Sequence, residues 1–151
     1  MEITLAQFDD SWKELSFRWL QQEELRALIE APSITHEQQD AWFKTLANRM
    51  DYKIWGVVYN HIPVGVCGLK NINEQQAEYW GYIGVMDYWG KGIGSKMMEF
   101  MEEKARGLKL KTLVLKVAAT NKRAIRLYEK AKFQPLSYST THLMMEKIIP
   151  Y

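Results

Sequence analysis

Residues 88–101 read YWGKGIGSKMMEFM, with glycines at positions 90, 92 and 94 ahead of a run in which apolar residues recur at helical spacing. A strand is expected to end near Val85, so the glycines lie in a short turn between a strand and a helix. The first turn of a helix carries backbone N–H groups without partners and a partial positive charge. Because glycine has no side chain to keep a ligand away, the stretch predicts a site for a pyrophosphate.

Two familiar phosphate-binding motifs do not fit this stretch. The P-loop pattern is absent, and the dinucleotide fingerprint needs another glycine spacing and an early strand–helix–strand unit. Lys91 and Lys96 add positive charge near the rim of the turn. A glycine-rich turn without any ligand remains the alternative interpretation.

The composition indicates an ordinary globular chain. Its 151 residues suffice for one domain, and 47% hydrophobic with 25% charged residues is a usual balance. The net charge of +2, without a basic cluster, gives no sign of a nucleic-acid surface. No apolar stretch approaches the ~18 residues of a membrane span. With Cys67 as the only cysteine and no signal peptide at the start, we expect a cytoplasmic protein without internal disulfides.

The first half of the chain changes from helical to strand periodicity. Helical spacing recurs early, and Thr35-His36-Glu37-Gln38 is a capping box that starts a helix. After residue 52, β-branched and aromatic runs surround a turn at 60–63 and predict a hairpin. The expected elements are a strand at 2–7, two short helices within 11–29, a helix from Thr35 to about Asn48, and strands at 53–59, 64–69 and 77–85.

The second half alternates helices and strands. The glycine-rich stretch opens a helix that runs to Arg106, with Gly107 as its stop. The later elements are a buried strand at 112–118, a helix capped by Asn121 that runs to about Lys130, and an extended tail over 133–149 with a turn near Pro135–Tyr138. The order predicts an α/β domain with a mixed sheet, because the central strands are joined too tightly for parallel crossovers.

Two motifs resemble those of the GNAT superfamily of N-acetyltransferases. Residues 89–94 are similar to its Q/R-x-x-G-x-G/A pattern, with Gly92 and Gly94 at the small positions and Trp89 at the Gln/Arg position. Residues 121–133, NKRAIRLYEKAKF, resemble its N-x-x-A-x-x-L-Y-E-K-x-G-F helix, with Lys132 where glycine is usual. The resemblance covers about residues 52–148. It implies a single N-acetyltransferase domain over 1–151, with a mixed, mostly antiparallel sheet splayed between its fourth and fifth strands and helices on both faces.

The resemblance also implies acetyl-CoA as the acetyl donor, and no metal. Pantetheine would lie between the splayed strands, where the backbone N–H of Gly84 or Val85 faces the thioester and Gly81 and Gly84 leave room. At Trp89 the backbone N–H would contact the phosphate. The further cofactor-binding positions are Gly90, Lys91, Gly92, Ile93, Gly94, Ser95, Asn121, Ala124 and Tyr128.

Transfer to an amine needs an acid and a base. Tyr128 matches the tyrosine that the family places near the thiol as general acid; a packed helix tyrosine is the alternative. Glu78 matches a glutamate that relatives use as base, and it shares a strand face with Trp80 and Tyr82, where a raised pKa is expected. A solvated edge glutamate is the alternative.

Other candidate groups for the chemistry are expected to be structural. His36, His61 and His142 rival Glu78 as the base, but the first two lie in a capping box and a turn. Cys67 lies in an apolar strand and is expected to pack, so direct attack by the amine is favoured over an acyl-cysteine route.

The acceptor is expected to be a small-molecule amine. Residues 19–27, 34–43 and 77–84 resemble a branch that acetylates ribosomal-protein alanine, spermidine or nucleotide-linked aminosugars, and the aminosugar is the substrate predicted here.

The sequence contains six tryptophans, and we expect most of them to pack in the core, with an aromatic-lined substrate cleft as the alternative. A non-catalytic CoA-binding module is the alternative to an enzyme. Neither nucleic acid nor a membrane is an expected partner, and a homodimer through the apolar strand at 143–149 is possible.

Overall fold

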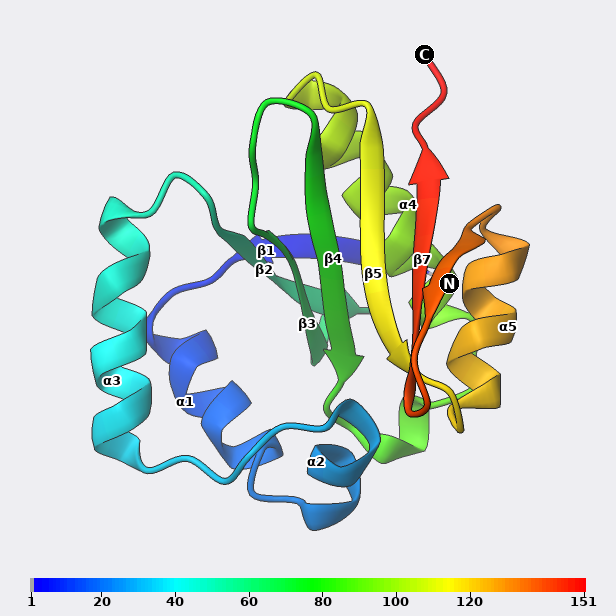
Figure 1. Ribbon diagram of the computed structural model, residues 1–151. Helices are drawn as coiled ribbons and strands as arrows, with labels where there is room; N and C mark the ends of the chain where they lie inside the picture. Colours follow the sequence, from blue (N-terminus) through cyan, green and yellow to red (C-terminus); the bar gives the residue numbers. More distant parts are fainter. Residues whose placement is uncertain (1) are drawn as a thin grey trace.

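The computed structural model describes residues 2–151 and contains one mixed sheet with helices on both faces (Figure 1). Its strands follow the spatial order β1-β2-β3-β4-β5-β7-β6, and only β4 and β5 are parallel neighbours. The strands are β1 Ile3–Gln7, β2 Lys53–Tyr59, β3 Ile62–Lys70, β4 Gln76–Ile83, β5 Thr112–Ala118, β6 Gln134–Tyr138 and β7 His142–Ile148. The helices are α1 Asp10–Trp19, α2 Glu23–Ile29, α3 His36–Thr45, α4 Ile93–Gly107 and α5 Lys122–Lys130, with 3₁₀ turns η1 Leu46–Asn48 and η2 Met86–Tyr88. The predicted fold class is confirmed.

The parallel contact between β4 and β5 is short. It joins Gln76, Ala77 and Glu78 to residues 112–114, and beyond Glu78 the two strands no longer pair. β5 is paired along its whole length with β7 on its other side. The sheet is therefore continuous but splayed between β4 and β5, as predicted.

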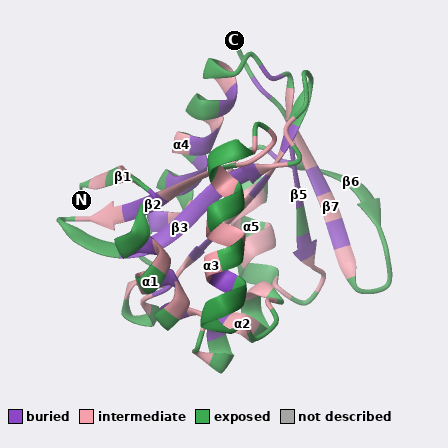
Figure 2. Ribbon diagram, turned by 90° about the vertical axis from the view of Figure 1, so that its left-hand side faces the viewer, coloured by how far each residue is buried: buried purple, intermediate pink, exposed green. Residues whose placement is uncertain are grey.

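Each face of the sheet has its own apolar core. On one face α4 and α5 pack over β3–β5, with Ile93, Met97 and Met101 fully buried. On the other face α1–α3 cover the sheet, with Trp12, Trp19 and Leu25 in the core. Figure 2 shows the buried residues concentrated in the central strands, whereas α3 is mostly exposed. Two of the tryptophans expected to pack are thus core residues.

The helix starts follow the sequence signals closely. The hydroxyl of Thr35 accepts from the N–H of Gln38 at 3.1 Å, and the Gln38 side chain accepts from the N–H of Thr35 at 2.9 Å. The side chain of Asn121 caps α5 by accepting from the N–H of Ala124 at 3.2 Å. Both predicted caps are confirmed.

Two predicted turns are wrong in position. The β2–β3 turn consists of Asn60 and His61 alone, both with positive φ (46° and 70°), so Ile62 and Pro63 belong to β3. A two-residue turn of this kind matches the twist of the strands. In the tail, Pro135 lies inside β6 and the turn falls at 139–141. Proline is tolerated there because β6 is an edge strand.

The end of α4 and the role of the tail strand also differ from the prediction. Gly107 is still helical, and Lys109 adopts the left-handed conformation (φ 60°) while the N–H of Leu110 donates to Ala105 O at 3.0 Å. The buried Leu110 side chain fixes this Schellman-type turn. The expected dimer strand, β7, lies between β5 and β6, so it has no free edge for a partner.

The turn after α5 yields a stability prediction. Lys132 is exposed and has φ 76°, a conformation that glycine adopts without steric cost. Lys132→Gly should raise the free energy of unfolding by about 1 kcal/mol or less in urea denaturation. The control Lys130→Gly, in the last helical position, should lower it by about the same amount. A destabilised Lys132→Gly variant would contradict this account of the turn.

Candidate active site

The turn before α4 presents a row of free backbone donors. Gly90 and Gly92 have φ values of 76° and 84°, and Gly92 is the N-cap of α4 without any side-chain cap. Within residues 2–151, no N–H from Gly90 to Ser95 donates to an acceptor. Six successive unpaired N–H groups at the start of a 15-residue helix are suited to an anion such as a diphosphate.

Helix α5 packs against this turn and brings a cation to it. A Cβ added at Gly90 would lie 2.3 Å from Nη2 of Arg123, and one added at Gly94 would lie 3.3 Å from Leu127. Lys96, in contrast, is paired with Glu99 at 3.1 Å. Sequence analysis missed Arg123, although it lies one helical turn before Leu127 in the second motif. The guanidinium adds positive charge beside the unpaired N–H groups.

The edge of β4 that faces the splay also has free donors. The N–H of Gly84 donates to Val64 O on β3 at 2.7 Å, so it is not available to a ligand. Strand N–H groups alternate in direction, and Ile83 therefore directs its N–H to the side of β5. The backbone continues extended through Val85 (φ −104°, ψ 106°), whose N–H points the same way. Of the two N–H groups expected to face a thioester, that of Val85 is unpaired and stays a prediction, whereas that of Gly84 is used by β3 and the prediction for it is wrong. The unpaired N–H of Ile83 was not predicted.

Gly81 in β4 and Gly84 just after it make room for the protein's own side chains. A Cβ at Gly84 would lie 2.2 Å from the indole of Trp19, and one at Gly81 would lie 2.9 Å from Met97 Cε. Both N–H groups of Trp89 already have partners within the protein. Its side-chain Nε1 donates to Ile83 O at 2.8 Å, and its backbone N–H donates to Met86 O at 3.0 Å. The space and the Trp89 N–H that the sequence assigned to the cofactor are therefore occupied.

Tyr128 reaches from α5 to β4. Its ring lies 6.3 Å from that of Tyr79 and 6.0 Å from that of Phe133, centroid to centroid. Burial raises the pKa of Tyr128 to about 12, and burial also raises the pKa of the fully buried Tyr79. The hydroxyl of Tyr128 makes no hydrogen bond to residues 2–151, so it is a neutral donor open to a ligand.

Glu78 lies at the closed end of the splay, opposite Val114. Its carboxylate lies 3.5 Å from Lys70 Nζ and accepts from Asn71 Nδ2 at 3.3 Å. The contacts of this group are polar, in place of the aromatic environment expected from strand alternation. Its assignment as the base stays a prediction.

The rival groups have structural roles. His36 stacks on Phe17 with ring centroids 3.7 Å apart, and His142 Nε2 contacts Glu30 at 2.7 Å. His61 lies in the β2–β3 turn. Cys67 is fully buried, and burial raises the pKa of its thiol to about 12. In the described part of the chain, no group of three His, Cys, Asp or Glu side chains is placed to hold a metal.

Two hollows lie on the α1–α3 side of β4. The larger, of about 420 Å³, borders the end of β4 and is lined by Leu15, Arg18, Trp19, Gln22, Gly84, Val85, Met86 and Asp87. The smaller, of about 180 Å³, lies deeper, between the sheet and α1 and α3. None of residues 90–95 lines either hollow. The anion site and the hollows are thus separate features on the two sides of the end of β4.

Comparison with known proteins identifies the family. Residues 11–133 match the Acetyltransferase (GNAT) family, so the chain belongs to this family of acetyltransferases. No curated protein matches the chain. Over residues 2–151, no helix is long and apolar enough to cross a membrane.

Solved structures support the fold. The Campylobacter jejuni N-acetyltransferase PseH in complex with acetyl coenzyme A has a TM-score of 0.77 at 21% identity, covering 97% of this chain and 99% of that one. The Vibrio cholerae spermidine N-acetyltransferase in complex with CoA and spermine has a TM-score of 0.89 at 16% identity, covering 97% and 95%. A Methanocaldococcus jannaschii domain has a TM-score of 0.87 at 19% identity, covering 97% and 98%. At these identities the likeness is one of fold.

The environment of Cys67 yields a test of the disfavoured acyl-cysteine route. Cys67 is fully buried, and burial raises the pKa of its thiol to about 12, so little thiolate is present at pH 8. The native protein should therefore not react with a thiol-specific chromogenic disulfide over minutes, whereas urea should expose one reactive thiol per chain. Rapid stoichiometric labelling of the native protein would show that Cys67 is accessible.

Proposed function

We propose that this protein transfers the acetyl group of acetyl-CoA to a primary amine by direct attack, within one domain spanning 1–151. The observation that carries the proposal is the row of free N–H groups from Gly90 to Ser95 beside the unpaired edge of β4. The family match supports the class of reaction. A cytoplasmic location is part of the proposal, because Cys67 is the only cysteine of the sequence and a chain without disulfides suits a reducing compartment.

The residues present fit acetyl-CoA. The N–H groups of the glycine turn suit its diphosphate, and Arg123 adds a charge-assisted donor. The N–H groups of Ile83 and Val85 suit the amide groups and thioester oxygen of an extended ligand along β4. When bound, acetyl-CoA supplies an activated acyl carbon and a thiolate leaving group.

Tyr128 is proposed to act by hydrogen bonding. Burial raises the pKa of Tyr128 to about 12, so the phenol is protonated at neutral pH. The hydroxyl therefore keeps its proton and donates a hydrogen bond where negative charge develops. This refines the general-acid role expected from the family resemblance.

Glu78 is proposed as the base for the acceptor. An alkyl ammonium with a pKa near ~10 must lose a proton before it can attack a carbonyl carbon. Glu78 is the carboxylate nearest the point where β4 and β5 separate, and its side chain is 22% exposed. Lys70, at 3.5 Å, holds the carboxylate on this side of β4.

The acceptor we favour is the amino group of a nucleotide-linked aminosugar. The basis is the resemblance of residues 19–27, 34–43 and 77–84 to that branch, together with the overall likeness to PseH. A polyamine would call for an acidic site, but among residues 2–151 Asp87 is the only carboxylate that lines either hollow. A homodimer stays a proposal, for which the edge strands β1 and β6 offer free backbone.

The first test concerns cofactor binding. Arg123→Ala should weaken acetyl-CoA binding about tenfold, the effect of losing one charge-assisted contact to a phosphate. Isothermal titration gives the Kd. The control is Arg126→Ala, an exposed arginine on the same helix, which should bind as the wild type does. No binding to the wild type would remove the basis of the proposed function.

The second test concerns turnover. Tyr128→Phe and Glu78→Gln should each lower kcat by about 10²–10³ in a thiol-release assay, because the first removes a hydrogen-bond donor to the developing negative charge and the second removes the base. Their acetyl-CoA affinity should stay within about twofold of the wild type. Tyr138→Phe, at an exposed position on β6, is the matched control. Binding of acetyl-CoA with no turnover on aminosugar, polyamine or peptide amines would favour a CoA-binding module.

A further inference from the structure

A single polar contact joins the end of α2 to the far side of the splay. His142 Nε2 lies 2.7 and 2.9 Å from the two carboxylate oxygens of Glu30. We call residues 26–34, which are the second half of α2 and the irregular segment after it, the flap. Within residues 2–151, this contact is the only hydrogen bond or ion pair between the flap and any residue outside 20–35. The polar attachment of the flap therefore depends on one pair of side chains.

The contact spans the open end of the splay. His142 is the first residue of β7 and lies opposite Ala118, the last residue of β5, well beyond the short pairing of β5 with β4. Before α2, Gln22 Nε2 donates to Gly84 O, just after β4, at 2.8 Å. Figure 1 shows α2 beyond the ends of these strands. The segment from Gln22 to the flap thus reaches from the end of one separated strand to the end of the other.

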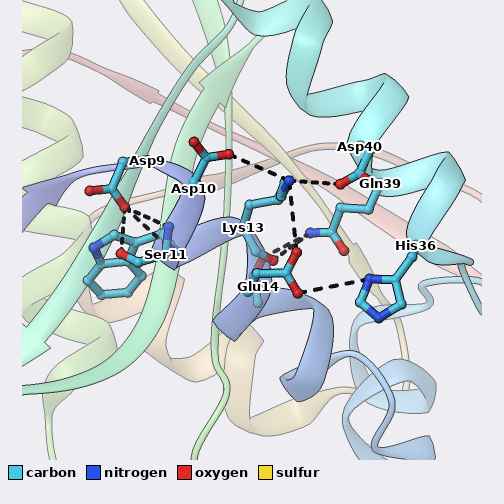
Figure 3. A network of polar contacts seen from close by, with 10 residues as sticks. Asp9, Asp10, Ser11, Lys13, Glu14, His36, Gln39 and Asp40 are labelled. Carbon is cyan, nitrogen blue, oxygen red and sulfur yellow. Dashed lines mark hydrogen bonds and ion pairs between the residues drawn. The ribbon is translucent and has the colours of Figure 1, made fainter.

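The flap is held less firmly than the segments on either side of it. None of its residues is buried, whereas Leu25, just before it, is 1% exposed. After the flap, α3 is fixed to α1, because Lys13 Nζ lies 2.8 Å from Asp40 and Gln39 Nε2 donates to Lys13 O at 3.2 Å (Figure 3). Segments with little buried surface open locally at a low cost in free energy. The flap can therefore move while both flanks stay in place.

The backbone of Glu30 favours a specific role for the contact. Glu30 is the C-cap of α2 and has a left-handed conformation (φ 57°), which glycine adopts without steric cost. Its partner is held in place, since His142 Nδ1 lies 2.7 Å from Thr141 Oγ1 and the His142 N–H donates to Ser139 Oγ at 3.0 Å. Strained residues of this kind occur in clamps and switch segments.

We infer that the flap is a gate on the α1–α3 side of the open end of the splay, and that the Glu30–His142 pair is its latch. The pair breaks to let the acceptor in and its acetylated product out, and it re-forms to cover the reacting groups during transfer. The side chains of Glu30 and His142 are 50% and 21% exposed, and a partly exposed ion pair contributes little stability and breaks readily. The passage of an acceptor rests on the proposed function, whereas the latch does not.

The first experiment measures the latch in the protein without ligands. Amide hydrogen exchange of residues 26–34 should be about fivefold or more faster in Glu30→Asn and in His142→Phe than in the wild type, because each removes one half of the pair. Asparagine is chosen because it tolerates the left-handed conformation. The double variant should exchange no faster than the single variants, since they break the same contact. Glu24→Gln, at an exposed position of α2, is the matched control and should exchange as the wild type does.

The second experiment locks the gate. Glu30→Cys combined with His142→Cys is bridged with a short bis-methanethiosulfonate, which links the two thiols by disulfides and is removed by reduction. The locked protein should bind acetyl-CoA within about twofold of the wild type, acetylate the amines of the turnover test about tenfold or more slowly, and recover on reduction. Wild type treated with the same reagent is the control, because its only cysteine, Cys67, is fully buried.

The outcomes separate this inference from the proposed function. Unchanged exchange in both single variants overturns the latch, and undiminished turnover in the locked protein overturns the gate. If transfer occurs in the wild type and either of these results is found, only this inference fails. If the wild type acetylates no amine while the latch variants exchange faster, the proposed function and the gate fail together and the latch stands.

Discussion

The short pairing between β4 and β5 is the constraint on which the site depends. Only three residues of each strand meet, whereas β5 is paired along its full length with β7. The sheet therefore stays continuous, while Ile83 at the end of β4 and Val85 just after it keep unpaired N–H groups. If β4 were paired along its full length, its N–H groups would bond to β5 and none would be free for an extended ligand. A ligand held at the glycine turn would then find no free backbone donors along the neighbouring strand.

The two sides of the sheet differ in character at the end of β4. The glycine turn, α4 and α5 form one side, where free N–H groups and Arg123 suit a polyanion. The α1–α3 side is aromatic and has an uncharged recess. β4 belongs to both sides, because its edge offers N–H groups while its face carries Glu78 and Trp80. In the reaction proposed above, this arrangement would let a charged donor and an acceptor approach the same strand without sharing a binding surface.

Burial raises the pKa of several side chains near β4. Tyr128 and Tyr79 meet in T-shaped contact, and burial raises the pKa of both, so that Tyr128 is a hydrogen-bond donor at any physiological pH. The same effect makes Cys67 a packing residue, since burial raises its pKa to about 12. Burying a neutral tyrosine or cysteine costs less free energy than burying its charged form. The neutral forms of these residues therefore fit the apolar interior on both faces of β4.

The sequence by itself determined the order of elements, the caps at Thr35 and Asn121 and the glycine turn, because each depends on local hydrogen bonds and backbone conformation. It misplaced the turns near Pro63 and Pro135, where strand pairing outweighed the turn preference of proline. It also assigned to a ligand the N–H of Gly84, which β3 uses. Only the tertiary structure placed Arg123 against Gly90, because this contact joins two elements that are far apart in the chain. Only the tertiary structure buried Gln39 Oε1 and Trp80 Nε1 without a partner, because packing between distant segments decides which polar atoms are covered.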